Sequence, residues 1–99
     1  MAEVSWSRSA QQDLHAIHDR IAIDSGLYAK RFIARIEDAV LQIGEFPGIG
    51  HPVPEFGVKH IRQIAVGDYR LIYLVLPEGV SIARVYHSAR LLRVIHLKA

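Results

Sequence analysis

Cysteine is absent from this chain of 99 residues. Its absence excludes a disulfide-linked scaffold, a zinc site built on thiolates and catalysis by a thiol, and it fits a reducing compartment. The chain also lacks an apolar run of about 18 to 20 residues, the length that a membrane-spanning helix needs. Its opening residues, Ala2 to Ser5, do not have the pattern of a secretory signal. We therefore expect a cytoplasmic protein without a membrane partner.

A strong charge of either sign is also lacking, because 12 basic and 10 acidic residues leave a net charge of +2. The two halves nevertheless differ, since residues 1–56 carry a net charge of −3 and residues 57–99 one of +5. This asymmetry predicts that an anionic partner meets the second half. Hydrophobic residues make up 51% of the chain, enough for a folded core, and the length leaves no room for a second one. We expect one domain, residues 1–99.

The first half of the chain has the pattern of two helices. Ser7 or Ser9 begins a stretch in which apolar residues recur every three or four positions, up to about Ile23. Residues 24–26 interrupt this pattern, and a second amphipathic stretch continues to about Gly44. Two amphipathic helices joined by so short a break form an antiparallel hairpin, because each covers the apolar stripe of the other.

The second half has the pattern of strands. Residues 46–57, FPGIGHPVPEFG, are rich in proline and glycine and predict a loop. After it the period becomes two, with strands expected over the ranges 59–66, 69–76 and 80–87. A short strand is also expected at residues 3–6, before the helices. The order βααβββ predicts an α+β fold, an antiparallel sheet with an N-terminal two-helix hairpin packed on one face.

The turns between the last three strands predict which residues face one another. A two-residue turn at Gly67 and Asp68 predicts these cross-strand pairs: Val66 with Tyr69, Ala65 with Arg70, Ile64 with Leu71 and Arg62 with Tyr73. A turn closed in the same way at Glu78 and Gly79 predicts these: Val75 with Ile82, Tyr73 with Arg84 and Arg70 with His87. Arg70 and His87 would then be neighbours on one face of the sheet.

These pairs divide the side chains of the sheet between two faces. The face toward the helices is expected to hold the following residues: Ile64, Val66, Leu71, Val75, Ile82, Tyr69, Tyr73 and Tyr86. The opposite face is expected to hold Gln63, Arg70, Ser81 and His87.

Four segments together resemble the ParE/RelE superfamily of toxins from bacterial type II toxin–antitoxin systems. They are Trp6-Ser7 with the following residues Ala10, Asp13-Leu14 and Ile17; the loop FPGIGHPVPEF; GDYRLIY at 67–73; and RVYHSAR at 84–90. No single segment is specific, but their order and spacing cover nearly the whole chain. The resemblance implies two N-terminal helices packed on an antiparallel sheet, the fold that periodicity indicates independently.

The superfamily implies one of two activities. ParE-like members poison DNA gyrase, whereas RelE-like and YoeB-like members cut messenger RNA on the ribosome. Nucleases that resemble YoeB use a glutamate between two loop prolines, a strand arginine, and a histidine-tyrosine pair. Arg70 and His87 match two of these positions, but Val53 stands in place of the glutamate and Ser88 in place of the tyrosine. Glu55 would need a loop rearrangement to substitute.

We therefore favour a ParE-like gyrase inhibitor, without a cofactor, over a nuclease that uses Arg70, His87 and Arg62. The small net charge also argues against a protein that binds the phosphate backbone of RNA. The resemblance further implies a cognate antitoxin, ParD-like or RelB-like, in a heteromeric complex. The candidate partner-binding residues are Gln63, Arg70, Arg84, His87, Arg90 and Arg93. His15 and His18 have a spacing that can bind metal, but no ligand motif accompanies them, and we expect no metal site.

Overall fold

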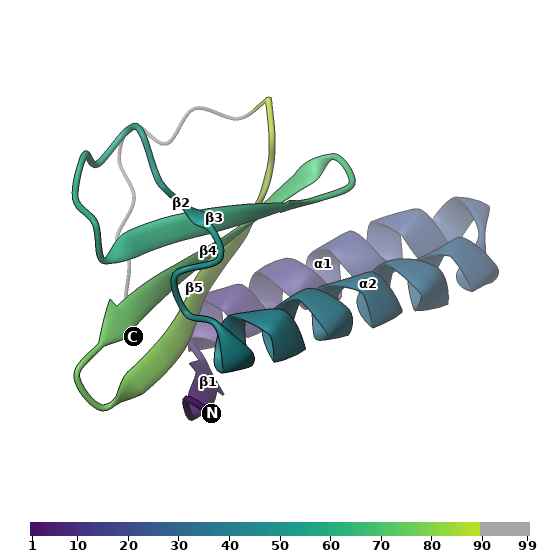
Figure 1. Ribbon diagram of the computed structural model, residues 1–99. Helices are drawn as coiled ribbons and strands as arrows, with labels where there is room; N and C mark the ends of the chain where they lie inside the picture. The colour runs from purple at the N-terminus through teal and green to yellow at the C-terminus, as the bar shows by residue number, and fades with distance from the viewer. Residues whose placement is uncertain (90–99) are drawn as a thin grey trace.

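The computed structural model describes residues 1–89 and consists of a helical hairpin packed on one face of a sheet (Figure 1). The elements in chain order are β1 (Val4–Trp6), α1 (Arg8–Asp24), α2 (Gly26–Glu45), β2 (His51–Pro52), β3 (Ile61–Val66), β4 (Tyr69–Leu76) and β5 (Gly79–His87). The predicted α+β class is confirmed, and so are the two helices and the three long strands.

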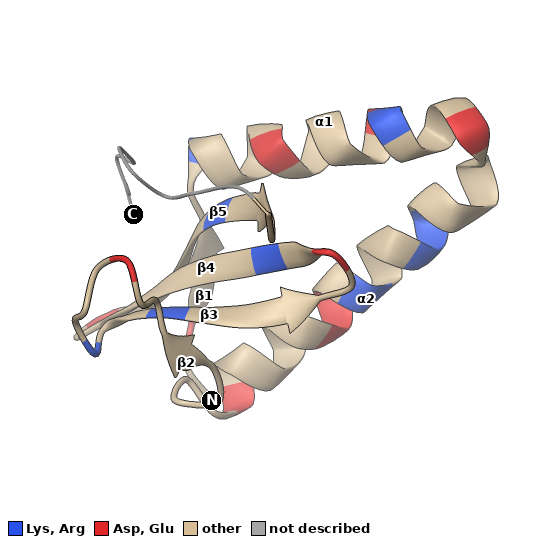
Figure 2. Cartoon of the chain, turned by 90° about the horizontal axis from the view of Figure 1, so that it is seen from above, with Lys and Arg blue, Asp and Glu red and all other residues tan. Residues whose placement is uncertain are grey.

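Two serines define the helical hairpin. The Ser7 hydroxyl accepts a hydrogen bond from the backbone N–H of Ala10 at 3.0 Å and so caps the start of α1. Ser25 ends α1 by donating its backbone N–H to the Ile21 carbonyl, and its hydroxyl starts α2 by accepting from the N–H of Tyr28. One residue therefore serves both helices, and this reverses the chain sharply. The turn end of both helices projects beyond the sheet in Figures 1 and 2.

The strand order is β1-β5-β4-β3-β2, and the sheet is mixed. The prediction of a wholly antiparallel sheet is wrong at one edge, because β1 pairs with β5 in parallel. The partner of β1 lies more than 70 residues further along the chain, so no local signal reveals its direction. The segment predicted as a loop also contains β2, which pairs with β3 through His51 and Pro52.

The predicted register between β3 and β4 is confirmed at all four pairs. The register between β4 and β5 was predicted wrongly, because Leu76 faces Gly79 and the turn residues are Pro77 and Glu78. Gly79 is the first residue of β5, and its position requires glycine. It has φ +149°, and a Cβ atom there would lie 2.5 Å from the carbonyl oxygen of Glu3, next to β1.

A bulge changes the register again further along β5. Tyr73 faces Ile82, whereas Ile72 faces Arg84, which leaves Ala83 without an opposite residue. Tyr73 and Val75 lie between the turn and the bulge, and because the turn differs they face Ile82 and Val80 instead of the predicted Arg84 and Ile82. The side chains of β5 beyond the bulge consequently point to different faces from those expected.

Two apolar clusters hold the sheet in place. The larger lies between the sheet and the helices, and its central buried residues include Ile17, Ile36, Leu71, Tyr73 and Ile82. The smaller lies on the other face, where Val53 and Ile72 are fully buried beside Phe56, Ile61 and Tyr86. The prediction that Tyr86 faces the helices is therefore wrong, because the bulge turns it to the opposite side.

Tyr73 connects the core to the loop before β2. It is fully buried, and its hydroxyl donates to the Pro47 carbonyl at 2.7 Å and accepts from the backbone N–H of Gly50 at 2.9 Å. The approach at Gly50 is close, because a Cβ atom there would lie 2.4 Å from the carbonyl oxygen of Gln63. The Tyr73 hydroxyl thus supplies hydrogen-bond partners for two backbone groups, the Pro47 carbonyl and the Gly50 N–H, in the irregular segment before β2.

We predict that Tyr73→Phe lowers the free energy of unfolding by about 2 kcal/mol, because it leaves a backbone N–H and a carbonyl without their partner. Urea denaturation of the purified protein measures the change. Tyr28→Phe is the matched control, since the side chain of Tyr28 is 62% exposed. Equal stabilities of the two variants would contradict the assignment.

Candidate functional site

Arg70 and His87, the pair predicted to act together, lie on opposite faces of the sheet. Arg70 faces Tyr86 across β4 and β5, and His87 faces Tyr69. Tyr69 belongs to the core beneath the helices, where its ring meets Phe32 edge-on at 5.1 Å. The bulge at Ala83 causes this change of face, because the different turn shifts the register by two residues, a shift that by itself would keep both side chains on one face. The predicted neighbouring pair is therefore wrong.

Arg70 belongs to a polar cluster on the face away from the helices. Its Nη1 atom donates to both carboxylate oxygens of Glu55, at 3.0 and 3.2 Å, and to the side-chain oxygen of Gln63 at 3.2 Å. The loop that carries Glu55 is anchored by Val53, which is fully buried against Ile72. Glu55 thus reaches Arg70 from this loop and neutralises the arginine.

Arg62, the third residue of the nuclease hypothesis, binds backbone oxygens of its own chain. Its Nη2 atom donates to the Gly50 carbonyl at 2.6 Å and to that of Gly48 at 3.2 Å, while Nη1 donates to that of Lys59 at 3.0 Å. These contacts hold the loop before β2 against β3. Arg90 and Arg93, two of the candidate partner-binding residues, lie outside the described residues.

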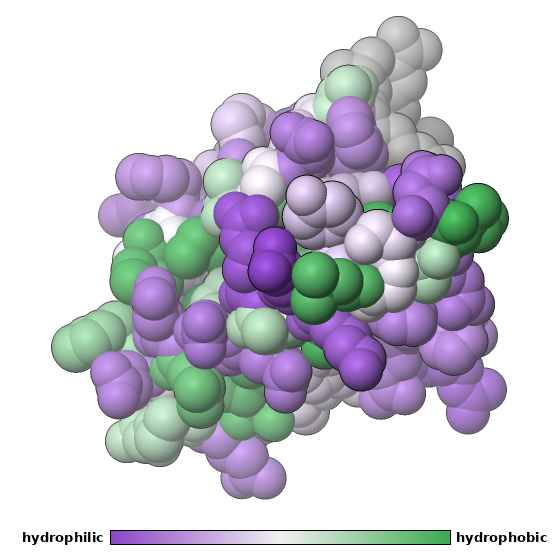
Figure 3. Space-filling view, turned by 90° about the vertical axis from the view of Figure 1, so that its right-hand side faces the viewer, coloured by the Kyte–Doolittle hydropathy of each residue, from purple (hydrophilic) through white to green (hydrophobic). Residues whose placement is uncertain are grey.

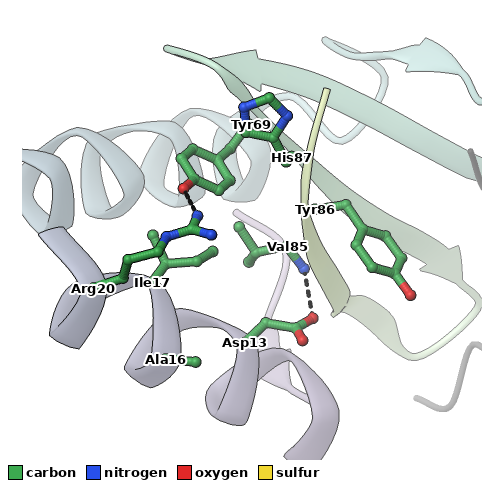
Figure 4. Close-up of a pocket in the computed structure, with 8 residues that line it drawn as sticks. All are labelled: Asp13, Ala16, Ile17, Arg20, Tyr69, Val85, Tyr86 and His87. Carbon is green, nitrogen blue, oxygen red and sulfur yellow. Dashed lines mark hydrogen bonds between the residues drawn. The ribbon is translucent and has the colours of Figure 1, made fainter. Parts of the chain in front are cut away.

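His87 lies on the other side of the sheet, at an open cleft of about 480 Å³ between α1 and the end of β5 (Figure 4). The cleft is lined by Asp13, Ala16, Ile17, Arg20, Tyr69, Val85, Tyr86 and His87. The imidazole of His87 meets the Tyr69 ring edge-on, with 5.4 Å between centroids. Its Nδ1 atom accepts from the backbone N–H of Ala89 at 3.2 Å.

Asp13 binds β5 at one end of this cleft. Its carboxylate accepts from Nε of Arg84 at 2.7 Å, from Nη2 of Arg84 at 2.9 Å and from the backbone N–H of Val85 at 3.0 Å. The hydrogen bonds to this carboxylate are the largest cause of a raised pKa of the Arg84 guanidinium, which therefore stays cationic. The guanidinium also lies 4.7 Å from the centroid of the Tyr86 ring.

Arg20 enters the cleft from the last part of α1. It donates a hydrogen bond to the hydroxyl of Tyr69, and its guanidinium carbon lies 5.9 Å from the centre of that ring. Sequence reasoning did not identify Arg20 or Asp13 as site residues. Their spacing from Ile17 is the signal that was available, because positions 13, 17 and 20 fall on one helix face, at the border of the apolar stripe.

No group of three or more histidine and acidic side chains in residues 1–89 is placed to hold a metal ion. On α1, the Nε2 atom of His15 lies 3.4 Å from Oδ2 of Asp19, and the Nδ1 atom of His18 lies 3.2 Å from Oδ1 of the same residue. Neither described helix is long and apolar enough to cross a membrane.

The fold and the cleft place the molecule among small α+β proteins in which a helical hairpin covers one face of a sheet. Sequence comparison identifies the group. The chain belongs to the family described as ParE toxin of type II toxin-antitoxin system, parDE, whose model matches residues 4–92. The resemblance to ParE/RelE toxins that the sequence motifs indicate is thereby confirmed.

Two individual proteins extend this comparison. Toxin RelE2 of Caulobacter vibrioides is 35% identical over 92 residues, which are 92% of this chain and all of the relative. A solved structure described as the chromosomal ParDE TA system from P. aeruginosa matches with a TM-score of 0.73 and 22% identity, over 88% of this chain and 96% of that one. This structural likeness supports the observed fold.

We predict that Asp13→Ala lowers the free energy of unfolding by about 2 to 3 kcal/mol, because it removes three hydrogen bonds and leaves Arg84 without its carboxylate. Urea denaturation gives the value. Glu37→Ala, at an exposed position of α2, is the control and should change stability by less than about 0.5 kcal/mol. A similar loss in both variants would show that Asp13 has no special role.

Proposed function

We propose that this ParE-family toxin inhibits DNA gyrase by protein contact and that a cognate antitoxin neutralises it in a heteromeric complex. The family to which the chain belongs supports a toxin of a toxin–antitoxin system. The choice of gyrase as the target rests on the resemblance to the ParE-like branch. Because gyrase acts on DNA inside the cell, we propose that the toxin acts in the cytoplasm.

The observation that carries the choice between the two branches is the separation of Arg70 from His87. Cleavage of RNA without a metal needs a base, an acid and cations arranged around one phosphate. Here the two candidate groups point to opposite faces, and the charge of Arg70 is neutralised by Glu55 at 3.0 Å. This arrangement favours binding over catalysis at these positions.

The distribution of side chains on the surface also favours a protein partner. In Figure 2, basic and acidic positions are interspersed along α1 and α2, so neither helix carries the uninterrupted run of cationic residues that would favour binding to RNA. The projecting end of the hairpin carries Ile23, Leu27 and Tyr28, each more than half exposed. Figure 3, which views that side, shows hydrophobic groups among hydrophilic ones, a mixture suited to protein contact.

We predict that the purified protein at micromolar concentration stops supercoiling by DNA gyrase and traps the cleaved DNA complex. Agarose gels of plasmid topoisomers measure both effects. We expect the antitoxin to be a small acidic protein encoded by the adjoining reading frame, and this protein, added beforehand, should restore supercoiling. Unaffected supercoiling together with no trapped complex would overturn the proposed target.

The nuclease alternative is tested in the same preparation. Messenger RNA in a translating extract should stay intact when the toxin is added, and primer extension detects any cut. Cleavage that disappears in His87→Ala would show instead that the protein is a ribosome-dependent endonuclease.

A further inference from the structure

Arg20 is the cation of the α1–β5 cleft that remains available to a ligand. The Asp13–Arg84 ion pair at the cleft is not available to a ligand, because the Asp13 carboxylate is already bound by Arg84 and by the backbone of β5. Among the described residues, Arg20 forms no ion pair, and its hydrogen-bond partner is the Tyr69 hydroxyl. A guanidinium has five N–H donors, so a planar anion can still bind to the remaining ones.

Tyr69 holds the guanidinium of Arg20 in a defined orientation before any ligand binds. The ring is buried in the core and held edge-on by Phe32, so its hydroxyl has a fixed position. In Figure 4 the side chain of Arg20 extends along the cleft toward that hydroxyl. A guanidinium oriented in advance loses less conformational entropy when it binds a carboxylate.

The rest of the cleft is suited to a polypeptide more than to nucleic acid. The buried residues Ile17 and Val85 form an apolar part of its base, and the exposed Ala16 also lines it, so the cleft can accept an aliphatic side chain. One available arginine is few for a nucleic acid, because binding to a phosphate backbone draws on several cations. An acidic residue next to an apolar one matches both parts of the cleft.

The edge of β5 beside the cleft is already occupied. Ser7 binds the carbonyls of Ile82 and Ala83, through its N–H at 2.9 Å and its hydroxyl at 2.8 Å, and Asp13 takes the N–H of Val85. An added strand would have to displace these contacts. A helix, which binds through its side chains, needs no free backbone group of β5.

We propose that Arg20 is a carboxylate-binding residue for an acidic amphipathic helix of a partner protein. An aliphatic side chain of that helix lies on Ile17 and Val85, and an Asp or Glu one turn away binds the guanidinium of Arg20. Tyr69 acts as the positioning residue. The inference rests on the proposed function, since it takes the cognate antitoxin as the partner.

The test measures the affinity of the full chain for the protein encoded by the adjoining reading frame, by isothermal titration calorimetry. Arg20→Glu should weaken binding by about tenfold or more, because it replaces a charged hydrogen bond by repulsion. The matched control is Arg35→Glu on α2, an exposed position that does not line the cleft, and this variant should change the affinity by less than about threefold. Thermal melting confirms that each variant is folded.

Charge reversal identifies the contact. An Asp or Glu to Lys substitution in the partner should restore binding to Arg20→Glu and weaken binding to the wild type. Tyr69→Phe should weaken binding while the charge of Arg20 is kept.

The outcomes separate the two levels of the proposal. Wild-type protein that does not bind the partner would overturn the proposed antitoxin pairing and this inference with it. Equal binding by wild type and Arg20→Glu would overturn the role of Arg20 alone. Loss of binding to a labelled single-stranded oligonucleotide in Arg20→Glu, with unchanged affinity for the partner protein, would show that the cleft is a nucleic-acid site.

Discussion

The carboxylate of Asp13 holds the helical layer and the sheet together at the place where the sheet loses its outer strand. Strand β1 is only three residues long and pairs with β5 up to Ile82. Beyond that point a bulge shifts β5, and the exposed edge would otherwise lack partners. Asp13 binds the Val85 N–H at 3.0 Å and the side chain of Arg84 at 2.7 Å, so α1 replaces the missing strand. Edge strands treated in this way resist unwanted pairing with other chains.

The bulge at Ala83 also explains which polar and charged side chains lie on each face of the sheet. Because β5 changes register at Ala83, His87 points to the cleft beside α1, and Tyr86 points to the small cluster around Val53. Arg70 stays on that second face, where Glu55 neutralises it. The groups that sequence motifs placed side by side thus belong to two separate environments. Two arginines of the sheet are each paired with a carboxylate of the same chain, Arg70 with Glu55 and Arg84 with Asp13.

The same geometry leaves an asymmetric surface for partners. The turn end of the helical hairpin exposes apolar side chains, whereas the cleft combines an apolar base with Arg20. A toxin of a toxin–antitoxin system has to contact a target and an inhibitor, and separate surfaces of one small domain can serve the two. The expectation that an anionic partner meets the positively charged second half stays a prediction, separate from the proposal for Arg20. Arg20 belongs to the first half, and two of the basic residues of the second half, Arg70 and Arg84, are paired with Glu55 and Asp13.

The features that depend on neighbouring residues could be predicted from the amino-acid sequence. Helical periodicity, the serine caps and the turn at Gly67 and Asp68 predict both helices, three strands and the correct pairing of β3 with β4, because each is decided within a few residues. The parallel pairing of β1, the bulge at Ala83 and the contacts of Asp13 and Arg20 could not be predicted in this way. These depend on backbone approaches between segments distant in the chain, such as that of Glu3 to Gly79. A side-chain period of two makes a strand face sensitive to a shift of one residue, and so the site was less predictable than the fold.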